Sequence, residues 1–188
     1  MSDLPWPYPT LPHYVRPGLR AIFVGYNPGL DSARAGHYYA RPGNRFWPHL
    51  SESGLVPHPV GPADDAQLMD LAGLGLTDLC PRPTLRADEL TRAELTQGAA
   101  HLASELRAAA PAAAVLNGRH LYDVFLREGL DLTRAPLRPF RWGPQSLPAG
   151  SFPGQLWVIP SSSGLASRWH GLRLQLLREV AGSLPSVS

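Results

Sequence analysis

The apolar residues of this chain are concentrated in four short runs, which polar and turn-forming segments separate. The runs span residues 19–24, 74–79, 112–116 and 156–159, and their length and composition predict buried β-strands. Between the runs, apolar side chains recur at the spacing of an amphipathic helix. This spacing predicts helices over residues 44–54 and 64–72, from the capping box of Thr91 and Glu94 through Leu106, from Gly118 to Gly129, and over residues 166–181.

Strands that alternate with helices indicate an α/β domain with a largely parallel sheet. We expect residues 19–182 to form this single domain, residues 1–18 to form an N-terminal arm, and residues 183–188 to be a tail. Residues 137–149, around Trp142, depart from the alternation and suggest a hairpin. Each motif described below leaves the carboxyl end of a predicted strand, which is where ligands bind in open α/β sheets.

The composition limits the chemistry that is open to the protein. The 188 residues carry a formal net charge of only +2, so affinity for nucleic acid would need local clusters of charge. All 17 basic residues are arginines, so a lysine-dependent lyase step is excluded and only the N-terminal amine could form a Schiff base. The single cysteine, Cys80, excludes an internal disulfide and a four-cysteine iron–sulfur site. The histidines lack metal-ligand spacing, and we predict no metal or other cofactor.

The chain shows no sign of a membrane or a secreted protein. No apolar run approaches the length that is needed to span a bilayer. The first residues, MSDLPWP, have neither the basic region nor the apolar core of a secretory signal. We therefore expect a cytoplasmic protein.

The most informative segment is the loop that follows the first predicted strand. Residues 24–47 read VGYNPGLDSARAGHYYARPGNRFW and bring together an amide, two adjacent tyrosines and three arginines. Such a loop suits a pocket that accepts a flat polar ring beside a polyanion. Asn27-Pro28-Gly29 alone would be an ordinary turn. The tyrosines and the PGNRFW segment favour a functional loop instead, because they follow at the spacing of a known enzyme family.

Residues 24–47 closely resemble the first motif of the mismatch-specific uracil and thymine DNA glycosylases. The resemblance runs from about Pro17 to Val180 and includes Gly75 to Leu79 with Arg82-Pro83-Thr84, Trp142-Gly143 with Gln145, and Trp157 to Leu165. It implies a three-layer α/β/α sandwich with a mainly parallel central sheet. It also implies a monomer that hydrolyses the N-glycosidic bond of uracil, or less readily thymine, mispaired with guanine in double-stranded DNA.

By this resemblance, a base that is flipped out of the duplex enters a pocket beside the first motif. Asn27 matches the catalytic asparagine of the family. Because an amide is no general base, it would position water and donate hydrogen bonds. Tyr39 matches the aromatic residue that stacks on the base, although core packing is the alternative. The backbone around Tyr26 and the Ser161 side chain would contact the base, and His37 would either line the pocket or lie at the surface.

Asp78 is a departure from the family pattern, in which lysine or asparagine is common at this position. A carboxylate with an ordinary pKa of about 3.9 is ionised at neutral pH and could activate water or stabilise a cationic sugar. We therefore expect Asp78 to share or to supply the catalytic base. The alternative is that Asp78 caps the turn toward Pro81.

The loop from Ser161 to Arg168 corresponds to the segment of the family that enters the DNA. Gly164 and Leu165 would form a wedge that fills the space left by the flipped base. Ser167 or Arg168 would contact the widowed guanine. Phosphate contacts are expected from the arginines nearest to the motifs, namely Arg34, Arg41 and Arg45.

Three functions compete at this point. The first is a monofunctional, mismatch-directed uracil-DNA glycosylase that acts by base flipping and direct hydrolysis. The second is a non-catalytic module of the same fold that senses damaged or mismatched DNA, against which the intact Asn27 argues. The third is a nucleotide-binding α/β enzyme, but the chain has neither a phosphate-binding loop nor a dinucleotide glycine pattern.

Overall fold

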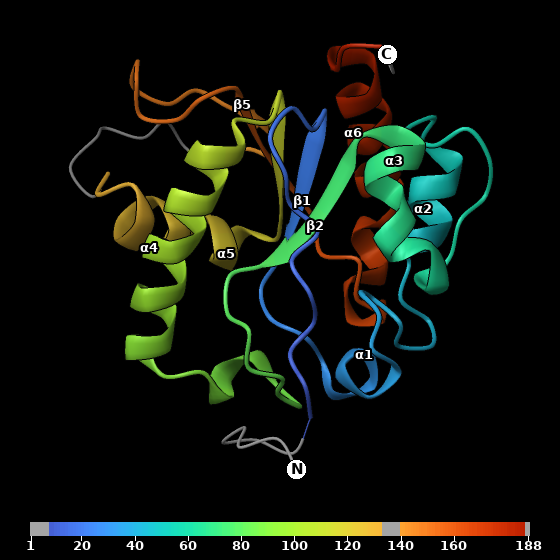
Figure 1. Ribbon diagram of the computed structural model, residues 1–188, viewed down its shortest axis with the longest axis horizontal. Helices are drawn as coiled ribbons and strands as arrows, with labels where there is room; N and C mark the ends of the chain where they lie inside the picture. The colour runs from blue at the N-terminus through green and yellow to red at the C-terminus, as the bar shows by residue number, and fades with distance from the viewer. Residues whose placement is uncertain (1–7, 133–139, 187–188) are drawn as a thin grey trace.

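Five short strands form a single sheet in the computed structural model, in the order β2-β1-β3-β5-β4 (Figure 1). Strands β1 (Ala21–Gly25), β2 (Leu74–Asp78), β3 (Ala113–Asn117) and β5 (Gln155–Ile159) are parallel to their neighbours. The short edge strand β4 (Gly143–Gln145) runs antiparallel to β5. Each parallel strand coincides closely with one of the predicted apolar runs, because a strand that is covered on both faces must be apolar at nearly every position.

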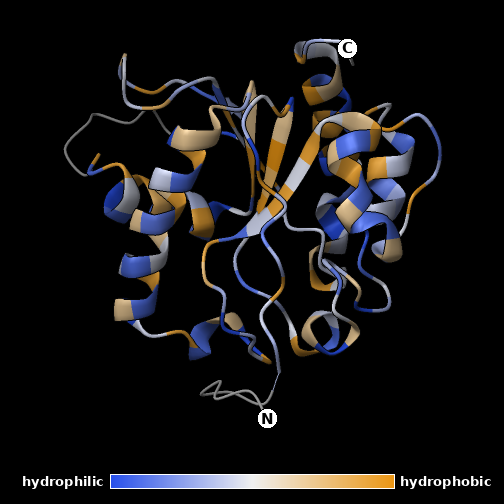
Figure 2. Cartoon of the chain, viewed as in Figure 1, coloured by the Kyte–Doolittle hydropathy of each residue, from blue (hydrophilic) through white to orange (hydrophobic). Residues whose placement is uncertain are grey.

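Helices cover both faces of the sheet and complete three layers (Figure 1). Helices α2 (Phe46–Glu52), α3 (Leu68–Ala72) and α6 (His170–Ser183) pack on one face, and α4 (Arg92–Ala109) and α5 (Arg119–Val124) pack on the other. Figure 2 shows the apolar stretches of the helices and central strands in orange and the polar residues in blue. The predicted α/β/α sandwich with a mainly parallel sheet is thus confirmed.

The structure describes residues 8–132 and 140–186. The parts of the predicted arm, hairpin and tail that fall on residues 1–7, 137–139 and 187–188 lie outside the described residues. Among the residues that it describes, no helix combines the length and apolar character that crossing a membrane requires.

The described part of the arm covers the edge of the sheet. Tyr14 and Leu76 of β2 exchange two backbone hydrogen bonds of 2.9 and 3.1 Å. Beside them, His13 Nδ1 lies 2.7 Å from Glu105 of α4, and Thr77 Oγ1 donates to the same carboxylate over 2.9 Å. The hydrogen bond to Glu105 raises the pKa of His13, because the carboxylate favours the charged imidazole. The arm therefore protects strand β2 from pairing with other chains.

Helix α1 (Leu30–Ala35) was not predicted. It begins after the extended Gly29 and ends at Gly36, which has a left-handed φ of 73° and whose N–H donates to Ser32. Only Ser32 and Ala33 are buried in this helix. Six residues with so little apolar surface cannot show the periodicity by which a longer helix is recognised.

Several predicted helices have different boundaries in the structure. The predicted 64–72 helix is a 3₁₀ turn, η1 (Pro62–Gln67), followed by α3, and the predicted 166–181 helix is η4 (Gly164–Trp169) followed by α6. The end of the predicted 118–129 helix is a π-helical turn, η3 (Phe125–Gly129), and a short 3₁₀ turn, η2 (Ala87–Glu89), precedes α4. Over a single turn the change in winding moves the apolar side chains only a little, so a pattern of a few residues does not separate these turns from an α-helix.

Candidate functional site

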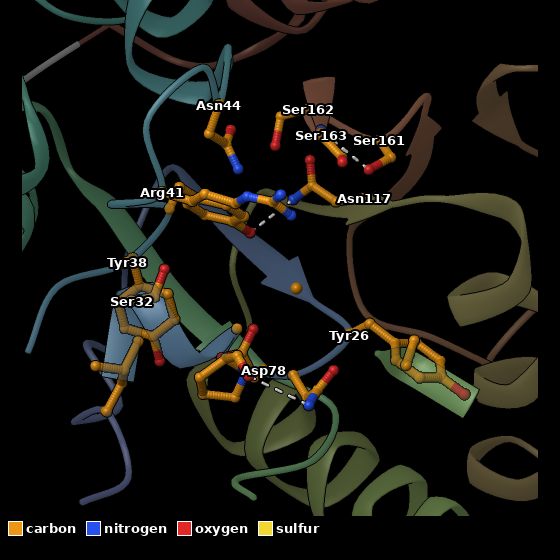
Figure 3. Close-up of a pocket in the computed structure, with 17 residues that line it drawn as sticks. Tyr26, Ser32, Tyr38, Arg41, Asn44, Asp78, Asn117, Ser161, Ser162 and Ser163 are labelled. Atoms are coloured by element: carbon orange, nitrogen blue, oxygen red, sulfur yellow. Dashed lines mark hydrogen bonds between the residues drawn. The ribbon is translucent and has the colours of Figure 1, made fainter. Parts of the chain in front are cut away.

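A cavity of about 260 Å³ lies at the carboxyl ends of β1, β2, β3 and β5 (Figure 3). The loops that follow these strands form its wall, together with the chain between α1 and α2. This volume is slightly below the ~300–1,000 Å³ of common ligand pockets, so the cavity suits a small ring. Its lining includes Gly25, Tyr26, Asn27, Tyr38, Tyr39, Arg41, Asn44, Asp78, Asn117 and Ser161 to Ser163.

Asn27 follows β1, and its side-chain amide is held in one orientation. Its Nδ2 donates to the Arg82 carbonyl over 2.9 Å and to Thr84 Oγ1 over 2.8 Å. A carbonyl can only accept, so the NH₂ group must face the loop that follows β2. Within the described chain no donor reaches the Oδ1 atom of Asn27. The cavity is therefore offered a fixed carbonyl oxygen, which is an acceptor for a water molecule.

Asp78 ends β2, and its carboxyl group is buried at the wall of the cavity, with 7% of the residue exposed. Burial raises its pKa to about 7, against a smaller lowering by the charge of His13. At neutral pH the group is therefore close to its midpoint, whereas the sequence suggested an ordinary, fully ionised carboxylate. Among the described residues its carboxyl group makes no hydrogen bond to the turn toward Pro81, so a capping role has no support.

Gly25 gives this carboxyl group its space. It pairs in register with Asp78 across the two parallel strands. A Cβ atom at position 25 would overlap with Oδ1 of Asp78 and would lie 3.1 Å from the hydroxyl oxygen of Tyr39. Both functional groups therefore converge on the bare Cα of Gly25, and a larger residue there would displace the carboxyl group.

Tyr39 lines the cavity in an uncommon backbone conformation, with a φ of 53°. One face of its ring stacks on Phe46, with centroids 3.9 Å apart and an angle of 16° between the rings. Its hydroxyl oxygen accepts a hydrogen bond of 3.0 Å from Asn117 Nδ2. Burial raises the pKa of this phenol, so it is a neutral hydroxyl at physiological pH. The ring is thus fixed at its edge and on one face.

The loop after β5 forms the rim of the cavity. Leu165 is 93% exposed, the highest exposure among the large apolar residues that the structure describes. Ser163 Oγ accepts a weak hydrogen bond from the Leu165 N–H at 3.4 Å, which helps to hold the residue at the start of η4. Gly164 and Leu165 also line a second hollow of about 240 Å³, together with Arg41 and Asn44. An apolar side chain is thereby presented to solvent beside the main cavity.

Residues 12–184 match the family model of the uracil DNA glycosylase superfamily. The chain belongs to this superfamily. Its fold is also similar to the solution structure of a Methanosarcina acetivorans protein that is provisionally named a uracil DNA glycosylase. The two chains are 16% identical, the TM-score is 0.57, and the match covers 92% of this chain and 98% of the other, a likeness that shows the fold alone. Membership in the superfamily supports the removal of uracil from DNA as the activity of this chain.

The remaining residues that the glycosylase resemblance placed around the base are only partly brought together. Tyr26 and Ser161 line the cavity, and the Tyr26 carbonyl already accepts a bond of 3.0 Å from Cys80 N. His37 lies outside the cavity lining. Its Nδ1 is 3.2 Å from Asp65, a buried carboxylate that also accepts the Tyr38 N–H over 3.1 Å. The His37 imidazole therefore contacts η1 and does not contribute to the lining of the cavity.

The arginines near the motifs are exposed around the same end of the sheet. Arg34 and Arg41 both approach Asp31, with nitrogen–oxygen distances of 3.3 and 3.8 Å, so their charge is partly neutralised. Arg45 and Arg168 form no ion pair with any residue that the structure describes. The backbone N–H of Arg45 donates to Ser162 over 2.9 Å, which joins the first motif to the rim loop. Ser167 and Arg168 lie in η4 with Gly164 and Leu165, but outside the lining of both hollows.

One group of side chains in the described chain has metal-ligating atoms close together, namely His13, His101 and Glu105, within 4.8 Å of one another. The hydrogen bonds of Glu105 to His13 and Thr77 account for this arrangement without an ion. The group lies between the arm and α4, outside the cavity lining. The expectation that the glycosylase needs no metal stays a prediction.

Sequence reasoning did not identify four residues that shape the cavity. Gly25 makes room for Asp78, and Thr84 orients Asn27. Asn117 binds the Tyr39 hydroxyl, and Arg173 orients Asn117. Asn117 could have been found, because it ends an apolar strand just as Asp78 does. Nothing in the sequence distinguishes Arg173 from Arg178, the other arginine of its helix.

Proposed function

We propose that this protein is a monofunctional DNA glycosylase that removes uracil, and less readily thymine, from mispairs with guanine in double-stranded DNA. The observation that carries the proposal is the pair Asn27 and Asp78, which line one small cavity from the ends of adjacent strands. Between them they offer a fixed acceptor oxygen and a carboxyl group that can take up a proton near pH 7. The partner is duplex DNA, bound by a monomer.

The reaction begins with the mispaired nucleotide turned out of the helix, which is easier for a mismatch than for a matched pair. The pyrimidine stacks on the face of Tyr39 that Phe46 leaves open. Stacking of this kind contributes about 1–3 kcal/mol. The rings of base, Tyr39 and Phe46 then form one stack, and the left-handed backbone at Tyr39 is the strained feature that places it.

Hydrolysis needs a water molecule next to C1′ of the sugar. Asn27 Oδ1 accepts one hydrogen of this water, and ionised Asp78 accepts the other as the bond to C1′ forms. The bond between C1′ and N1 breaks, and its electron pair leaves with the pyrimidine. With no lysine in the chain, the resulting abasic strand is left uncut.

A duplex with one G·U pair tests the proposal directly. Incubation followed by alkali should cut the strand at the former uracil, and omission of alkali should leave it intact. Assays with an A·U duplex, a G·T duplex and a single strand that contains uracil would rank the substrates. The alternative, a non-catalytic sensor of mismatched DNA, predicts binding to the G·U duplex without any alkali-sensitive site.

Leu165→Ala tests the proposed wedge. We expect uracil removal from duplex DNA to fall roughly tenfold or more, because two to three buried CH₂ groups contribute about 0.8 kcal/mol each. Removal from single strands should change little, since there is no helical gap to fill. Leu85→Ala is a matched control, because Leu85, at 73%, is the other strongly exposed leucine among the residues that the structure describes. Equal losses on both substrates would argue against a wedge.

A further inference from the structure

Arg173 of α6 is an arginine that the proposed mechanism does not use, and it is fully buried. Its Nη1 donates to Asn117 Oδ1 over 2.8 Å and to the Pro160 carbonyl over 2.6 Å. Its Nε and Nη2 have no hydrogen-bond partner among the described residues. No carboxylate of the described chain pairs with it, and its guanidinium carbon lies 5.8 Å from the centroid of the Phe46 ring.

Such a group is unfavourable for folding. A buried charge without a counter-ion costs several kcal/mol, and replacing buried ions by apolar residues of similar size often leaves a protein as stable or more stable. Burial lowers the pKa of Arg173 only to about 10, so it remains charged at neutral pH. Its presence therefore has no explanation in stability and calls for one in function.

Arg173 is connected to the cavity through Asn117. Because the guanidinium occupies Asn117 Oδ1, the Nδ2 atom must face the other way, where it donates to the Tyr39 hydroxyl over 3.0 Å and to the Val24 carbonyl over 3.1 Å. The Tyr39 oxygen is thus an acceptor from Asn117, and its own proton is free to point elsewhere. In this series of hydrogen bonds, the dipoles of the Asn117 amide and the Tyr39 hydroxyl have their positive ends directed away from Arg173, so the bonds strengthen one another.

The base stacked on Tyr39 becomes negatively charged as its bond to the sugar breaks. A fixed positive charge in a region that excludes water acts strongly on charge that develops nearby. We propose that Arg173 is a positioning residue that stabilises the departing pyrimidine anion, through its own field and through the aligned Asn117 and Tyr39 dipoles. This inference rests on the proposed glycosylase function and adds to it the group that assists the leaving base.

Arg173→Met tests the inference, because methionine fills similar space without charge. Single-turnover rates should be measured on duplexes with guanine opposite uracil or opposite 5-fluorouracil, whose more acidic N1 leaves more easily. We expect the rate for uracil to fall about 10- to 100-fold, somewhat less than the loss of a direct donor. The rate for 5-fluorouracil should fall much less. Arg178→Met is the matched control, since it removes an exposed arginine from the same helix.

Two further readouts separate this role from a structural one. The thermal midpoint of Arg173→Met should equal or exceed that of the natural protein. The midpoint of its pH–rate profile should not move, because Arg173 is not among the groups that shift the pKa of Asp78. If Arg173→Met does not fold, Asn117→Asp replaces it, since the new carboxylate would neutralise the cation in place.

Equal losses for uracil and 5-fluorouracil would overturn the inference, as would rates that stay unchanged for both bases. A natural protein that releases uracil from no DNA substrate would overturn the proposed function and this inference together. An active natural protein whose variant shows no altered dependence on the leaving base would overturn the role of Arg173 alone.

Discussion

Asp78→Asn should lower the rate of uracil removal by about 10²–10⁴, the usual contribution of a general base. The amide keeps the size of the carboxyl group but cannot accept the proton of the attacking water. In the natural protein the rate should rise with pH and level off above about pH 7, because only the ionised form of Asp78 is active. In the variant this rise should be absent. Single-turnover assays between pH 5 and 9 on a G·U duplex measure both effects.

The same substitution, Asp78→Asn, should raise the stability of the folded protein although it lowers the reaction rate. The pKa of Asp78 is raised by folding, so the folded protein binds its proton more tightly than the unfolded chain does. The destabilisation that the ionised Asp78 carboxylate causes is absent below the unfolded pKa of about 4 and is complete above about pH 7. Asp78→Asn should therefore melt at a higher temperature than the natural protein at pH 8 and at a similar one at pH 4. Asp70→Asn, at an exposed carboxylate, is the control. Near-normal turnover in Asp78→Asn would remove this residue from the mechanism.

Asn27→Ala should lower the rate by about 10²–10³, comparable to the loss of one preorganised polar group in an active site. The water would lose the oxygen that aims it at the sugar, while Asp78 would remain able to take its proton. Binding to a G·U duplex, measured by mobility shift, should change far less than the rate. Thr84→Val should have an intermediate effect, because it removes one of the two short bonds that orient the amide. Loss of binding together with activity would indicate that Asn27 holds the DNA rather than the water.

The pattern of apolar residues was sufficient to predict four of the five strands and most of the helices. Strands β1, β2, β3 and β5 are buried along most of their length, so their sequences are mainly apolar, and polar side chains stand only at or next to their ends. Helix α1 lacked such a signal, because Gly29 and Gly36 define it rather than buried apolar residues. Helix α2 begins at Phe46, two residues after the start of the predicted 44–54 helix, and Asn44 Oδ1 accepts the Phe46 N–H over 2.9 Å.

Residues of the proposed site could be predicted where one side chain in a recognisable segment has the proposed role. They could not be predicted where the role depends on burial by neighbouring residues. Asn27, Tyr39 and Leu165 belong to recognisable segments, and the structure places them around one cavity and its rim. The raised pKa of Asp78 depends on burial by residues that are distant in sequence, so composition could not supply it. The buried charge of Arg173 likewise depends on which face of α6 meets the sheet.

The convergence of Gly25 and Asp78 makes two distant positions behave as one unit. Gly25 and Asp78 are neighbours across β1 and β2. No side-chain atom fits at the first position, Gly25, while a carboxylate occupies the second, Asp78. Among related chains the two positions should therefore change together, and a side chain at the first should be accompanied by a shorter residue at the second. Covariation at this pair would therefore separate the members of the superfamily that have a carboxylate at the second position from those that have another residue there. The separation needs only sequences.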